Sequence, residues 1–224
     1  MSDFDSDSPL ESDWSDRGNL AWNEFDWERY LRNQDEAIQL YLARYEALRR
    51  CADRIDAVAE QMGWEQAEME EEETADSRVE EEDSADFDEG EQVYTLHKNP
   101  VFIATKAIYL GLRRPWELLA ADSAKVPGAL AISYLVSLQR GEEHACQAVH
   151  ALDFGDYAMA ISLFKRALAE LNQSLALLGA PAAVKHRAVA AYREDALPRL
   201  FDLREIWLRV TNECRDELNR PGEE

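Results

Sequence analysis

The sequence predicts an all-α protein, and three observations support that prediction. Apolar residues recur at alternating spacings of three and four over five long stretches, as on one buried face of a helix. No stretch alternates with a period of two, and no Asn-Gly hairpin turn occurs. The connections between the last helical stretches are short, which is typical of antiparallel neighbours. We therefore expect an antiparallel up-and-down bundle of about five helices.

The first predicted helix covers residues 23–63. Asn23 is the expected N-cap, acidic residues follow it in the first turn, and Gly63 is the expected residue after the helix end. A helix of this length is stable only if it lies along a partner surface for most of its course. We expect it to dock on the rest of the bundle through an apolar stripe of Ile38, Tyr41, Tyr45, Leu48, Ala52, Ile55, Ala59 and Met62.

Residues 99–219 are expected to form the bundle core. Asn99 followed by a proline predicts a helix start, and Pro115 either kinks that helix or opens a second one. The stretch 129–138 is apolar on nearly every side, which predicts a position in the centre of the core. In the last helix, Pro198 is expected to bend or break the chain.

Two strongly acidic segments are set apart from these helices. Residues 1–17 hold six acidic residues and one arginine, and residues 65–92 hold fifteen acidic residues and one arginine. Such composition does not bury enough apolar area to offset the cost of ordering the backbone. We expect a disordered tail over 1–22, a disordered linker over 64–98, and a short tail over 220–224.

The cysteine pattern and the start of the chain predict a cytoplasmic protein. Cys51, Cys146 and Cys214 are odd in number and widely spaced, which favours reduced thiols, although the pattern assigns no role to any of them. The first residues are acidic rather than basic, and no apolar run approaches the length of a membrane helix. A formal charge of −22 opposes binding to nucleic acid or to an anionic membrane.

The stretch "GDYAMAISLFKRALA" is similar to the second helix of a tetratricopeptide repeat. The matching residues are Gly155, Tyr157, Ala160, Ile161, Phe164, Ala167 and Leu168. The preceding residues can stand for the first helix, so the resemblance covers 144–174 and implies a helix pair that presents a protein-binding surface. No second copy of the pattern occurs, although such arrays need about three units. A wall of a closed bundle is therefore favoured over a repeat array.

Candidate metal ligands are weak, and no catalytic residues are proposed. His144, Cys146 and His150 lie close in sequence, but only Cys146 and His150 are four residues apart and share a helix face. Two ligands do not make a structural zinc site. The alternative hypothesis is a small-molecule or metal site in the core of the bundle, formed around these three residues and His186. No nucleophile elbow and no phosphate-binding loop occurs, so we expect neither a cofactor nor an enzyme.

Candidate partner contacts are large apolar side chains, either in the polar N-terminal stretch or in the regular apolar seam, which is the series of apolar residues at spacings of four and three over residues 157–178. They are Trp14, Trp22, Phe25, Trp27, Tyr157 and Phe164. Basic pairs at 49–50, 113–114 and 165–166 are expected to face solvent near acidic residues. The preferred hypothesis is a non-enzymatic adaptor that presents a helical surface, with a protein partner that is basic if it contacts the acidic linker. A weaker alternative is a nucleic-acid mimic that uses residues 65–92.

Overall fold

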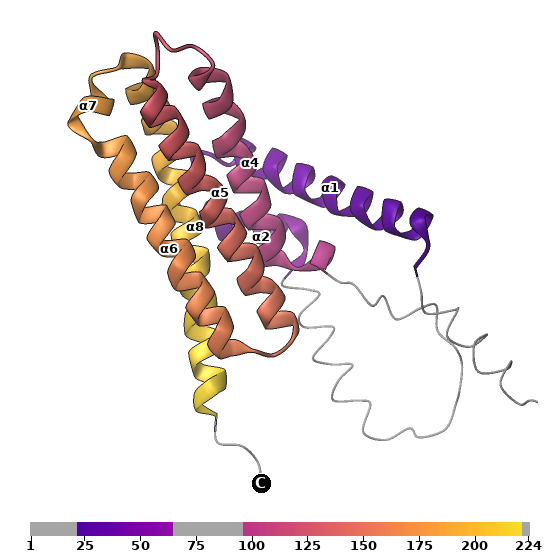
Figure 1. The fold of residues 1–224 in the computed structure, drawn as a ribbon. Coiled ribbons are helices and arrows are strands. Elements are labelled where there is room, and N and C mark those ends of the chain that lie inside the picture. Colours follow the sequence, from indigo (N-terminus) through magenta and orange to yellow (C-terminus); the bar gives the residue numbers. More distant parts are fainter. Residues whose placement is uncertain (1–21, 65–95, 221–224) are drawn as a thin grey trace, which may run out of the picture.

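The computed structural model describes residues 22–64 and 96–220 of the chain (Figure 1). Within these residues it is entirely helical and contains no strand, which confirms the all-α prediction. The two acidic segments, with their predicted disorder, lie largely outside the described residues. The elements are α1 (Glu24–Ala47), α2 (Arg54–Met62), a 3₁₀ turn (Leu96–Lys98), α4 (Pro100–Ala120), α5 (Gly128–Asp153), α6 (Tyr157–Gly179), α7 (Pro181–Val184) and α8 (Arg187–Asn219).

Four long helices, α4, α5, α6 and α8, lie side by side and enclose the core (Figure 1). Helix α5 packs between α4 and α6, and α8 contacts both α6 and α4, which closes the bundle. Aromatic side chains fill its centre. The ring of Trp207 stacks on Tyr109 with a centroid distance of 6.0 Å and lies 6.4 Å from Phe164. All three side chains are buried, so α4, α6 and α8 share one apolar core.

The first turns of α5 are not central, and that prediction is wrong. Tyr134 and Leu138 are buried, but Ile132 is 67% exposed and Val136 is 37% exposed. Because α5 packs mainly on α4 and α6, its remaining face is left to solvent. Residues 129–138 are apolar on nearly every side, but only one side is buried. The other side forms an exposed apolar strip on the outside of the bundle.

The predicted helix ends are confirmed where the side chains cap the backbone. The Asn23 side chain accepts hydrogen bonds from the backbone N–H groups of Phe25 and Asp26 in a capping box. Asn99 accepts one from Phe102 at 3.0 Å. Gly63 ends α2 with a φ of 77°, a left-handed conformation that glycine adopts without steric cost.

Neither internal proline ends its helix. Pro115 lies inside α4, so the prediction of a second helix there is wrong, and Pro198 lies inside an unbroken α8. Both prolines are exposed, whereas Trp116 and Leu200 nearby are fully buried. The missing N–H group of each proline therefore lies toward the solvent side, and core packing holds the helix across it.

The prediction of one helix over 23–63 is wrong. The chain leaves helical geometry between Leu48 and Asp53 and continues as α2. No glycine or proline causes this break. It is favoured by tertiary contacts, because the change of direction buries Val58 completely and brings Arg54 to the surface of α8. Ala52, expected on the buried stripe, is exposed in the break.

Helix α1 crosses α4 and projects away from the four-helix bundle (Figure 1). The crossing is close at Gly111, where an added Cβ would lie 3.2 Å from Leu42 Cδ1.

Both ends of the predicted 64–98 linker belong to helical elements, which corrects its bounds. Trp64 stacks on Tyr41 with a centroid distance of 5.6 Å, and Leu96 packs against the core in the 3₁₀ turn.

Candidate interaction surfaces

The aromatic candidates near the start of α1 form a cluster among themselves. The rings of Trp22 and Trp27 are 4.9 Å apart, and Tyr30 lies 5.4 Å and 6.0 Å from them. Phe25 stays outside this cluster and is 72% exposed. Trp14 lies outside the described residues. Of the four predicted N-terminal aromatics, Phe25 is thus the most accessible to a partner in the described part of the chain.

The other two partner candidates lie on α6. Phe164 is fully buried against Trp207, so its prediction as a partner contact is wrong, while Tyr157 is half-buried at the first position of the helix. Phe164 belongs to the regular apolar seam, and that seam faces α8 and the core. The Gly155 corner that carried the tetratricopeptide resemblance has a φ of 71°. It gives the chain a tight turn between two helices of this bundle.

The three metal candidates do not converge. Cys146 and His150 line one surface groove, and His144, whose buried Nδ1 has no hydrogen-bond partner among the described residues, does not line it. His186 precedes α8, beyond α7. Within the ranges 22–64 and 96–220, no group of three or more His, Cys, Asp or Glu residues could hold a metal ion.

A buried carboxylate on α5 is the polar group most clearly missed from the sequence. Glu142 is 6% exposed, and it accepts hydrogen bonds from Lys106 Nζ at 2.6 Å and from Arg113 Nη1 at 2.9 Å. Both cations belong to α4. A charge this deep is expected only when it is paired. The pairing leaves Arg113 half-buried, which corrects the expectation that its basic pair faces solvent.

Two open grooves meet at this charge cluster. One, of about 370 Å³, lies between α4 and α5 and is lined by Gln139, Glu143, Cys146, Gln147 and His150. The other, of about 460 Å³, lies between α4 and α1 and is lined by Asp35, Ile38, Gln39, Leu110 and Arg114. Both also include Lys106, Arg113 and Glu142. We call this pair of depressions the α4 groove.

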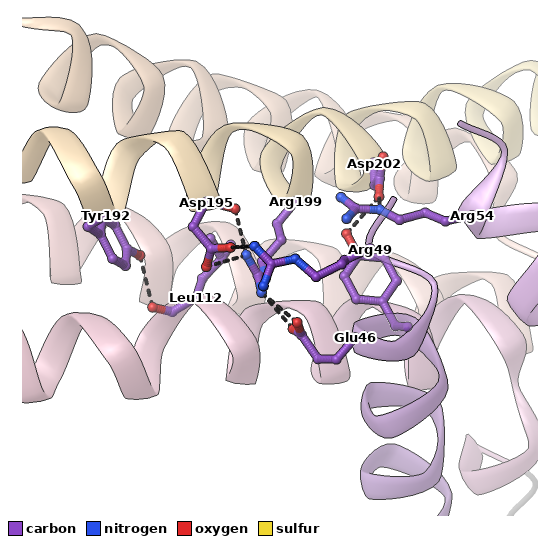
Figure 2. A network of polar contacts seen from close by, with 9 residues as sticks. Glu46, Arg49, Arg54, Leu112, Tyr192, Asp195, Arg199 and Asp202 are labelled. Atoms are coloured by element: carbon purple, nitrogen blue, oxygen red, sulfur yellow. Dashed lines mark hydrogen bonds and ion pairs between the residues drawn. The ribbon is translucent and has the colours of Figure 1, made fainter. Parts of the chain in front are cut away.

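A polar network fixes α1 to α8, as Figure 2 shows. Arg199 Nη2 donates to both oxygens of Glu46, at 2.7 and 2.8 Å, and Arg199 Nη1 lies 2.6 Å from Asp195 Oδ2. Burial would lower the pKa of Arg199, but its hydrogen bonds to Asp195 and Glu46 raise it above the usual value. Arg49 adds an ion pair to Asp195 at 3.4 Å.

The same network continues to α2. Asp202 accepts a hydrogen bond from Arg54 (Figure 2). It also accepts one from the Tyr45 hydroxyl at 2.6 Å, and the Arg54 guanidinium lies 4.2 Å above the Tyr45 ring. Burial and the hydrogen bond to Asp202 raise the pKa of Tyr45 well above its usual range. Arg209 of α8 forms a further ion pair with Asp56 of α2 at 2.5 Å. These contacts hold the α1–α2 hairpin in place, so that α1 forms one wall of the α4 groove.

The cysteine thiols show no activated nucleophile in the described residues. Burial raises the pKa of Cys146 to about 11, an effect that Lys106 opposes and Glu142 reinforces. Burial likewise raises the pKa of Cys214. Cys51 is exposed in the break after α1. At neutral pH, Cys146 is therefore a thiol rather than a thiolate, although it lines the α4 groove.

Comparison with known proteins adds no relative. No family model matches the chain, and neither curated proteins nor solved structures give a significant match. Among the described helices, none combines the length and apolarity required to cross a membrane.

Proposed function

We propose that this protein is a non-enzymatic adaptor whose helical surface binds a protein partner at the α4 groove. The observation that carries the proposal is the α4 groove itself. Two adjoining depressions on either side of α4 share the buried Glu142 cluster. Open surface depressions on a rigid scaffold can receive side chains of a partner helix or peptide.

The arrangement of charge supports a preformed site. Lys106 and Arg113 are anchored by Glu142, so their positions are fixed before a partner arrives, which lowers the entropy lost on binding. The walls carry neutral amides, Gln139 and Gln147, that can both donate and accept hydrogen bonds. The raised pKa of Cys146 favours recognition over nucleophilic chemistry in this groove.

Site-specific photocrosslinking tests the proposal in the full chain. p-Benzoylphenylalanine is introduced separately at Gln139 and Gln147 on the groove wall, and at exposed Gln173 on α6 as the matched control. Irradiation in an extract of the native cells should give the same adduct from both groove positions and none from Gln173. Mass spectrometry then identifies the partner.

A blocking variant provides the second test. Gln139→Trp with Gln147→Trp fills the depression between α4 and α5 without touching the Glu142 pairs, and it should abolish the partner's retention by an affinity-tagged chain. Gln173→Trp should leave retention unchanged. Equal crosslinking from Gln173, or undiminished retention by the blocked variant, would contradict the proposed function.

A further inference from the structure

Helix α8 carries cations on one face that form no ion pair with any carboxylate of the described residues. Arg193, Arg204 and Arg215 follow one another at intervals of eleven residues. Eleven residues make about three helical turns with a drift of roughly 20°, so the three side chains share one face over about 33 Å. Arg204 and Arg215 are exposed, and Arg193 is half-buried.

The carboxylates of α8 lie on another side. Each of the three arginines is followed directly by an acid, Glu194, Glu205 or Asp216, which lies about 100° further round the helix. That rotation leads toward the side that faces α1 and α2, where Asp195 pairs with Arg49 and Asp202 pairs with Arg54. Glu205 pairs with Arg209 of α8 itself. Within the described chain, Arg193, Arg204 and Arg215 form no ion pair, and Arg215 donates only to Asn212.

The cationic face of α8 borders α6. Trp207, three residues after Arg204 and therefore next to it on the helix surface, is buried with its ring 6.4 Å from Phe164 of α6. On α6, Ser174 meets Ser137 of α5 and Phe164 faces Trp207 of α8. Lys165 follows Phe164 by one residue, about 100° further from α5, so it lies on the flank next to α8. It is exposed and has no ion pair among the described residues.

Exposed apolar side chains accompany these cations. Leu208, four residues after Arg204, is 37% exposed, and Phe201, three residues before Arg204, is 50% exposed. We call Lys165, Arg193, Arg204, Arg215 and Leu208 the α6–α8 seam. A row of cations that lack an ion pair in the described part of the chain, set beside apolar groups, complements a segment that carries both carboxylates and apolar side chains.

We propose that the α6–α8 seam is a second docking surface, which binds an acidic segment of a partner protein. Charge complementarity commits the proposal to an acidic segment of a partner, and the crosslinking arm below distinguishes that segment from this chain's own acidic residues. The exposed apolar side chain of Leu208 beside the cations favours a protein segment, which carries apolar side chains of its own, over a nucleic acid.

Fluorescence anisotropy with labelled poly-L-glutamate of about twenty residues tests the proposal on the full chain. The wild type should bind at about 20 mM salt and lose binding at about 500 mM, because the Debye length falls severalfold. The variant R193Q/R204Q/R215Q should bind about tenfold more weakly or worse, since each exposed pair contributes a modest share. A second variant, R204Q/R215Q, spares the half-buried Arg193 and should show most of the loss.

The matched control is R29Q/R50Q/R140Q, which removes three exposed arginines elsewhere and changes the net charge by the same amount. It should bind within about twofold of the wild type, and circular dichroism should show helix in every variant. No binding by the wild type at low salt, or equal losses in seam and control variants, overturns the proposal. The blocked α4 groove variant should bind normally, so the two proposals fail separately.

Two further arms decide the nature of the occupant. Carbodiimide crosslinking of the dilute free protein should not join Lys165 to carboxylates of residues 65–92; such a crosslink assigns the seam to this chain itself and overturns the proposal. Single-stranded DNA with the same number of charges should bind more weakly than polyglutamate. DNA binding of equal strength overturns the assignment to a protein partner.

Discussion

Removing the two partners of the Glu46–Arg199 ion pair should have unequal effects on stability. Arg199 has a side chain only 9% exposed, whereas Glu46 and Asp195 are 37% and 40% exposed. If Glu46 is replaced by alanine, a buried guanidinium loses both hydrogen bonds to that carboxylate and keeps only Asp195. If Arg199 is replaced by methionine, two carboxylates remain, but water reaches both of them.

The expected magnitudes follow from this difference in burial. Breaking a buried pair while the charge stays buried costs about 3–5 kcal/mol, and the surviving contacts to Asp195 place Glu46→Ala near the lower end, at about 3 kcal/mol. Arg199→Met should cost about 1 kcal/mol, because a hydrophobic side chain replaces the buried charge. Neither change alters helix propensity appreciably. The difference of about 2 kcal/mol corresponds to roughly thirtyfold in the unfolding equilibrium.

Urea unfolding followed by far-UV circular dichroism measures both variants. With a slope of about 2 kcal/mol per M, Glu46→Ala should lower the midpoint by about 1.5 M and Arg199→Met by about 0.5 M. The double variant should resemble Arg199→Met alone, because no buried charge is left. Glu28→Ala is the control, since its pair with Arg32 is 66% exposed on both sides and should contribute under about 1 kcal/mol. A larger loss for Arg199→Met than for Glu46→Ala would refute this reasoning.

Gly141→Ala should destabilise the protein by about 1–3 kcal/mol in the same assay, because the added Cβ would overlap the Tyr109 hydroxyl. Gly179→Ala is the control and should be neutral or stabilising, because the space around Gly179 is open. Equal effects of the two substitutions would contradict the close contact at Gly141. At pH 8, iodoacetamide should modify the exposed Cys51 well before Cys146. Because the pKa of Cys146 is raised to about 11, its reactivity should increase only as the pH approaches that value. Peptide mapping at several pH values measures the order, and early modification of Cys146 would show that its thiol is not held protonated.

The sequence was a good guide to the parts of the fold that local chemistry determines. The helical spacing, the Asn23 and Asn99 caps and the left-handed Gly63 depend on residues within one or two turns, and the structure confirms them. It was a poor guide to the path of the first helix. Continuing the apolar stripe through residues 48–53 is locally acceptable, and the break is favoured by tertiary contacts of α2 with α8 and with α1.

The candidate sites divide in the same way. The apolar seam that includes Phe164 was visible in the sequence, but the side on which α8 would cover it was not, so a core residue was predicted as a partner contact. Glu142 could not be assigned from sequence, because its partners lie 36 and 29 residues away. The eleven-residue spacing of Arg193, Arg204 and Arg215 was present in the printed sequence. Only the structure shows that, over residues 22–64 and 96–220, carboxylates on the other side of α8 are paired while these cations form no ion pair.

The sequence by itself determined that this chain folds as helices, where most of them begin, and that its acidic residues concentrate in two segments, since propensity, capping and composition act over a few neighbouring residues. Tertiary structure alone decided that α1 and α2 separate, that Arg199 and Glu142 are buried with partners, and which apolar and cationic faces stay exposed. Those outcomes depend on which surfaces meet in space, and burial and ion pairing become defined only after distant helices are in contact.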